Sequence, residues 1–163
     1  MRRKPEGRVH GPASDAWRPG AGGGIAAGAI IYTKDGALPV EYLCPGDRII
    51  TRDAGLVTLR AVDWRRGLVD RVRIRRGVLG HLRPLRDTEI PADQGVLIRD
   101  WRAQALFGAA QAVIPAARLV DGAHVTDEGA GEMTLFTLRF DRPHVIYADG
   151  LELAAAAPAA AEA

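Results

Sequence analysis

Turn-forming residues recur along this chain at intervals that leave room only for short regular elements. The 163 residues include 19 glycines and 10 prolines, and pairs such as Asp35-Gly36 and Asp149-Gly150 are typical of tight turns between strands. The stretches between the turns are short and apolar, and residues 134–140 alternate apolar and polar side chains as a half-buried strand does. The sequence therefore predicts an all-β fold, mainly strands with one or two short helices.

The predicted strands are separated by turns that contain Gly or Pro. They cover residues 29–33, 38–43, 48–51, 56–64, 69–75, 96–99, 112–114, 134–140 and 145–148, the last being the final strand. Arg65-Arg66-Gly67 is predicted to be the turn between the strands at 56–64 and 69–75. Helix-favouring residues predict a short helix over Trp101–Phe107 that ends at Gly108, and residues 116–120 are predicted to form a helical turn.

One domain flanked by two tails is predicted. Residues 1–23 are rich in Gly, Pro and charge, which predicts a disordered basic tail. Residues 24–153 form the domain, and residues 154–163 form an Ala-rich tail, either a frayed helical turn or disordered. The net charge of +2 comes from the first tail, which argues against a basic nucleic-acid-binding domain. The longest apolar candidate, residues 22–32, falls short of the ~20 residues that span a membrane, and without a clear signal peptide the cytoplasm is the favoured compartment.

Short motifs within residues 24–153 occur in the order found in one known family. They are Gly24-Ile25-Ala26-Ala27-Gly28-Ala29-Ile30-Ile31, Pro39-Val40-Glu41, Pro45-Gly46-Asp47, Trp64-Arg65-Arg66, Leu106-Phe107-Gly108, Val113-Ile114-Pro115-Ala116, Leu119-Val120-Asp121-Gly122, Phe140-Asp141-Arg142 and Ala148-Asp149-Gly150. Each motif alone is ordinary, but the ordered set resembles the bacterial Hint domain, the module shared by Hedgehog proteins and inteins. The resemblance implies a horseshoe of two related β-subdomains, with the first residue of the domain in a central cleft.

The resemblance also implies a chemistry whose side chains are missing here. Hint domains cleave the peptide bond before their first residue: a Cys or Ser attacks the preceding carbonyl, a His protonates the leaving amine, and donors hold the oxyanion. The position that matches the nucleophile is Gly24, and the position that matches the His is Gln94, which cannot exchange a proton near neutral pH. Near the end of the domain Pro143 takes the place of a further His, and His144 follows it. We therefore expect a scaffold kept without its self-cleaving site.

Few other residues offer chemistry. Cys44, the only cysteine, is a candidate displaced nucleophile, although its turn position without a nearby His favours a structural thiol. His144 with Asp141 is a candidate acid–base pair, against a structural, hydrogen-bonded His. The His residues lack ligand spacing, so neither a metal nor a cofactor is expected.

Three functions remain open at this point. The first is a Hint domain without self-cleavage that serves as an interaction or accessory module, its partner a protein rather than a nucleic acid. The second is a self-processing Hint domain with an unorthodox nucleophile. The third is an anion-binding module, because strand alternation places Arg71, Arg73 and Arg75 on one face. A solvated face balanced by acidic residues explains the same arginine pattern.

Overall fold

The computed structural model describes residues 23–155, most of which lie in strands. The elements are β1 (Ile25–Ala26), β2 (Ile30–Thr33), β3 (Gly36–Pro39), β4 (Arg48–Thr51), β5 (Gly55–Thr58), β6 (Ala61–Ile74), β7 (Thr88–Pro91), β8 (Gly95–Ile98), α1 (Trp101–Phe107), β9 (Ala112–Pro115), β10 (Val125–Arg139), β11 (His144–Ala148) and β12 (Leu151–Ala155), with 3-10 helices at Val40–Tyr42 and Ala116–Leu119. The predicted tails, apart from Gly23 and residues 154–155, lie outside the described residues.

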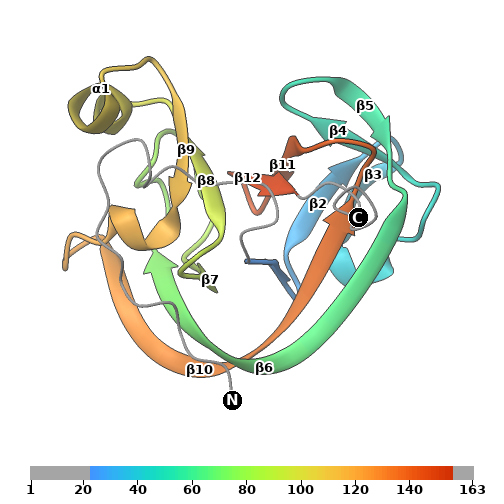
Figure 1. Cartoon of the computed structure of the whole chain (residues 1–163), viewed down its shortest axis with the longest axis horizontal. Helices are drawn as coiled ribbons and strands as arrows, with labels where there is room; N and C mark the ends of the chain where they lie inside the picture. Colours follow the sequence, from blue (N-terminus) through green and yellow to red (C-terminus); the bar gives the residue numbers. More distant parts are fainter. Residues whose placement is uncertain (1–22, 156–163) are drawn as a thin grey trace.

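The two longest strands, β6 and β10, join the two lobes of the molecule. They are antiparallel partners from Ala61 opposite Arg139 to Ile74 opposite Val125. Figure 1 shows them side by side as a curved ribbon that forms the bottom of a horseshoe. β1 pairs with β10 and β7 pairs with β6, which gives a four-stranded sheet of order β1-β10-β6-β7.

The second sheet extends across both lobes through β12. Its strands follow the order β3-β2-β4-β11-β12-β8-β9, and β5 pairs with β4. β12 pairs with β11 on one side and with β8 on the other. In Figure 1, β11 and β12 lie between the lobe that contains β2 to β5 and the lobe that contains β7 to β9.

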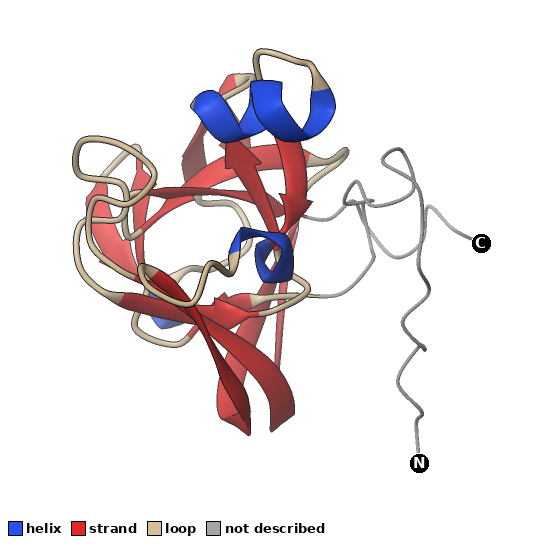
Figure 2. Cartoon of the chain, turned by 90° about the vertical axis from the view of Figure 1, so that its left-hand side faces the viewer, coloured by secondary structure: helices blue, strands red, loops and turns tan. Residues whose placement is uncertain are grey.

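Apolar side chains from both sheets form the core. Alternate residues are buried in β4 and β11, as in strands with one face against a core, whereas every residue of β8 and β12 is buried. The large side chains at the centre of the core include Phe140, Ile31, Ile49 and Ile114, each 0% exposed. Figure 2 shows the body built of strands and α1 at one end of it. Within residues 23–155, no helix has the length and apolar character to cross a membrane.

The predicted fold class is confirmed, and the predicted helix has the observed bounds. In α1, the Asp100 side chain accepts a hydrogen bond from the Arg102 N–H at the start, and Gly108 ends the helix with a φ of 65°. Both are local signals, since a side-chain acceptor satisfies a free N–H at the first turn and a glycine adopts the left-handed conformation at the last.

The predicted turn at Arg65-Arg66-Gly67 is wrong, because β6 runs through these residues without interruption. They pair in continuous register with residues 133–135 of β10. The long-range ladder of hydrogen bonds therefore prevails over the local turn signal of a glycine after two polar residues.

The prediction lacks three strands, and two of its segments are divided in the structure. β1, β7 and β12 were not predicted, so β11 is not the last strand, and residues 154 and 155 continue β12. β12 was missed because an Ala-rich strand that is buried on both faces shows no alternation. The segment 38–43 splits into the end of β3 and a 3-10 helix over Val40–Tyr42, and the segment 56–64 splits into β5 and the start of β6.

Candidate functional site

Two side chains that are distant in sequence hold the peptide bond between Gly23 and Gly24. The Gly24 N–H donates a 2.8 Å hydrogen bond to Oε1 of Gln94. Nη2 of Arg65 donates a 3.1 Å hydrogen bond to the carbonyl oxygen of Gly23. Directly after this bond, Ile25 pairs with Phe136 of β10, so the chain is fixed on both sides of Gly24.

Gln94 is oriented by its own hydrogen bonds. The residue is 2% exposed, and its Nε2 donates to the carbonyl oxygens of Gly95 at 2.9 Å and Ala154 at 2.8 Å. A carboxamide donates through nitrogen and accepts through oxygen, so these bonds leave Oε1 as the acceptor for the Gly24 N–H. Ala154 belongs to β12, and the last described strand therefore sets the orientation of Gln94.

The space for a side chain on residue 24 is already occupied. A Cβ placed on Gly24 would lie 2.9 Å from the Cβ of Leu135, and the Gly24 φ of +140° is one that other residues rarely adopt. Leu135 is 1% exposed in β10, where close packing resists displacement. Residue 24 thus has no hydroxyl or thiol, and its surroundings leave no room for one without rearrangement.

The carboxyl group of Asp93 contacts the same backbone segment. Desolvation of the Asp93 carboxyl raises its pKa above the usual value, and hydrogen bonds from the backbone N–H groups of Asp93 and Gly23, together with the positive charge of Arg65, offset only part of this effect. Asp93 accepts from the Gly23 N–H, whereas the Gly24 N–H, on the leaving side of the peptide bond, donates to Gln94.

His144 and Asp141 are not partners in the structure. Nδ1 of His144 lies 2.8 Å from Oδ2 of Asp53, and Asp141 forms an ion pair with Arg60 at 3.1 Å. Desolvation raises the pKa of Asp53, but hydrogen bonds from the Val145 N–H and from His144 outweigh it and hold that pKa below the usual value. The His144 side chain is 6% exposed. The contact with Asp53 ties the β4–β5 turn to β11.

Cys44 lies in the turn before β4 and is exposed. Its backbone N–H donates to Oδ2 of Asp47, and its Sγ lies 3.9 Å from the carbonyl oxygen of Tyr42. These contacts are local to the turn, and no hydrogen bond between Cys44 and a histidine occurs in the described part of the chain. The structure does not bring Cys44 and Gly24 together.

The arginines of β6 are engaged with acidic and carbonyl oxygens. Arg71 and Arg73 both form ion pairs with Glu89 of β7, at 3.1 Å and 3.2 Å. Arg71 also donates to the carbonyl oxygens of Glu128 and Gly129. Arg75 is exposed. Acidic neighbours therefore neutralise much of the face that strand alternation suggested for anions.

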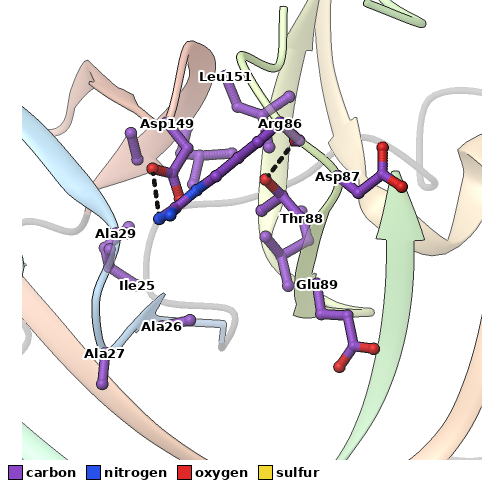
Figure 3. A pocket seen from close by; sticks show the side chains of 13 residues that line it. Ile25, Ala26, Ala27, Ala29, Arg86, Asp87, Thr88, Glu89, Asp149 and Leu151 are labelled. Atoms are coloured by element: carbon purple, nitrogen blue, oxygen red, sulfur yellow. Dashed lines mark hydrogen bonds and ion pairs between the residues drawn. The ribbon is translucent and has the colours of Figure 1, made fainter. Parts of the chain in front are cut away.

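A cavity of about 210 Å³ lies beside the site, between β1 and β7. Figure 3 shows Ile25 and Ala26 on one side, Thr88 and Glu89 on the other, and the Arg86 side chain across it. Arg86 is paired with Asp149 at 3.0 Å. Within residues 23–155, no group of three or more His, Cys, Asp or Glu could hold a metal ion.

Two contacts of the site could not be found from the sequence. Arg65 belongs to a motif that carried the resemblance, but it was assigned to a turn, and its partner Gly23 is 42 positions away. Asp53 lies in the turn between β4 and β5, and its contact with His144 spans 91 positions. No local pattern signals either pairing.

Solved structures with the same fold include inteins and an intein-like domain. An intein-like domain from Clostridium thermocellum matches with a TM-score of 0.56 and 14% identity, covering 83% of this chain and 99% of that one. A DnaB intein from Synechocystis sp. PCC 6803 matches with a TM-score of 0.53 and 14% identity over 83% and 99%. The MchDnaB-1 intein matches with a TM-score of 0.52 and 16% identity over 79% and 98%. At these identities the likeness concerns the fold.

The sequence itself also matches a family. A search of curated protein sequences gives no match. A model of the Hint domain family matches residues 24–160, which is most of the chain and begins at the residue held by Gln94. The resemblance noted in the motifs is therefore confirmed, and this chain belongs to the Hint domain family.

Proposed function

We propose that this Hint domain does not cleave itself and serves as an interaction or accessory module. One observation carries the proposal: the peptide bond before residue 24 is held in place by Arg65 and Gln94, next to a residue that has no nucleophile. Arg65 donates to the Gly23 carbonyl oxygen, but residue 24 has no hydroxyl or thiol to attack the carbonyl carbon.

The hydrogen-bond partner of the Gly24 nitrogen supports the same proposal. To break this bond, the nitrogen of Gly24 must gain a proton. Gln94 presents an oxygen to the Gly24 N–H and commits both protons of its Nε2 to carbonyl oxygens. It therefore has no proton to give, and as a carboxamide it has no acidic form near neutral pH.

Exposed aromatic side chains support a role in interactions. Trp64 of β6 is 66% exposed and Trp101 of α1 is 69% exposed. Aromatic residues are enriched where proteins contact one another, and these two lie in different parts of the horseshoe. A scaffold that presents such residues can bind a partner without any chemistry at Gly24.

Intact-mass spectrometry of the full-length chain, incubated with and without dithiothreitol, tests the proposal. We expect only the intact chain, because an external thiol has no thioester to cleave. A fragment that begins at residue 24 would contradict the proposal. The Cys44→Ser variant serves as the matched control: loss of that fragment in this variant would identify Cys44 as the unorthodox nucleophile.

A further inference from the structure

We propose that the side chains around Gly23 and Gly24 form a binding site for an unsubstituted Gly–Gly backbone, and that this site holds the two residues permanently against the domain. We call the side chains of Arg65, Asp93, Gln94 and Leu135 around this backbone the Gly–Gly slot. The inference rests on the proposed function, because cleavage before Gly24 would release the bound segment.

The polar contacts of the Gly–Gly slot all go to backbone atoms. Arg65 donates to the Gly23 carbonyl oxygen, and Gln94 accepts from the Gly24 N–H. Asp93 accepts a hydrogen bond from the Gly23 N–H. Both amide N–H groups and the carbonyl oxygen between them thereby have hydrogen-bond partners, as backbone polar groups removed from water require.

Steric contacts leave no room for a side chain at either position without rearrangement. A Cβ on Gly23 would lie 2.6 Å from Oε1 and 2.8 Å from Cα of Gln94, and a Cβ on Gly24 would lie 2.9 Å from Leu135. Gly28 is different: its φ of +89° is close to the +94° of Gly23, but no atom would lie within 4 Å of its Cβ. Tight surroundings, and not backbone conformation alone, thus require glycine in the Gly–Gly slot.

Glutamine suits a permanent contact better than histidine does. A histidine that gains a proton loses its acceptor and becomes a donor on both nitrogens, so it would repel the Gly24 N–H at acidic pH. The Gln94 carboxamide keeps its acceptor at every physiological pH, and its two other hydrogen bonds to Gly95 and Ala154 hold it in place. Gln94 in place of a histidine therefore removes the proton donor and also makes the hydrogen bond to the Gly24 N–H independent of pH.

Amide hydrogen exchange on the ¹⁵N-labelled full-length chain tests the Gly–Gly slot. We expect the Gly24 amide to exchange slowly in the parent. Arg65→Met removes the hydrogen bond to the Gly23 carbonyl oxygen, so the peptide between Gly23 and Gly24 is held less firmly. We therefore expect the Gly24 amide to exchange at least about tenfold faster in this variant, the scale of one lost hydrogen bond from a charged donor. The Ala27 amide, bonded to the Thr134 carbonyl oxygen at 3.0 Å, reports on β1 and is expected to keep its rate.

Arg66→Met is the matched control. Arg66 neighbours Arg65 in β6, is 59% exposed, and pairs with Glu132. Its loss is expected to change Gly24 exchange less than about twofold, as for an exposed ion pair. An unprotected Gly24 amide in the intact parent, or equal acceleration in both variants, would overturn the inference. The mass of the same sample separates this failure from that of the proposed function, since only the latter produces a shortened chain.

Discussion

Replacing Arg99 by methionine is expected to destabilise the fold through a carboxylate left buried. Glu152 of β12 is 3% exposed and receives two hydrogen bonds from Arg99, Nε to Oε1 at 2.9 Å and Nη2 to Oε2 at 2.6 Å. Arg52 is the remaining partner, with its Nε 3.4 Å from Oε1. Because Arg99→Met removes both close donors and the carboxylate stays out of water, we expect a loss of about 3 kcal/mol in the free energy of unfolding.

Arg60 supplies a matched control with the same type of contact at the surface. Its Nε and Nη2 bond the Asp141 carboxylate at 3.1 Å and 3.2 Å, but the side chains of Arg60 and Asp141 are 54% and 69% exposed. Water replaces the lost contact there, so Arg60→Met is expected to cost less than about 1 kcal/mol. Urea unfolding followed by circular dichroism measures both, and about 3 kcal/mol corresponds to a midpoint lower by roughly 1–2 M.

The double variant Arg99→Met/Glu152→Met isolates the buried charge. With no carboxylate left to solvate, we expect it to recover most of the loss and unfold within about 1 kcal/mol of the parent. Equal losses in Arg99→Met and Arg60→Met, or a double variant weaker than Arg99→Met alone, would refute the assignment of the loss to burial of Glu152.

Two further predictions concern a glycine and an aspartate. Gly23→Ala is expected to cost at least about 3 kcal/mol, against about 1 kcal/mol for Gly28→Ala, because both incur backbone strain but only the first also meets Gln94; urea midpoints of the two variants measure the difference, and equal values would contradict it. Backbone N–H groups of residues 123–125 lower the pKa of Asp121 from 3.8 to about 2. The ionised Asp121 therefore makes its full contribution to the free energy of unfolding above about pH 4, and this contribution is lost as the pH falls toward 2. The thermal unfolding temperature is expected to fall less steeply between pH 5 and 2 in Asp121→Asn than in the parent. Parallel curves of unfolding temperature against pH would contradict this prediction.

Sequence patterns identified the elements that are fixed by neighbouring residues. α1 was predicted with its correct bounds because its cap and its terminal glycine lie within a few positions of the helix. The turn at residues 65–67 was wrong because the pairing of β6 with β10 is decided by residues some 70 positions away. Local signals carry no information about such partners.

The candidate site was predicted only in part for the same reason. Ordered motifs pointed to Gly24 and Gln94, and the structure brings the two into contact at 2.8 Å. The packing of Leu135 against residue 24 and the hydrogen bond from Arg65 depend on where the curved ribbon of β6 and β10 places these two side chains. Curvature of a long ribbon is a property of the assembled sheet and has no counterpart in a short motif.

The position of β12 has a consequence for biosynthesis. This strand is the one that pairs with both β11 and β8, and its Ala154 carbonyl oxygen orients Gln94. Domains assemble as the nascent polypeptide leaves the ribosome, but here the half-sheets on either side of β12 stay unjoined until residues 151–155 have been translated. A stalled or prematurely terminated product that lacks these residues exposes two unpaired edges at once, which makes it a substrate for chaperones and proteases rather than a smaller working domain.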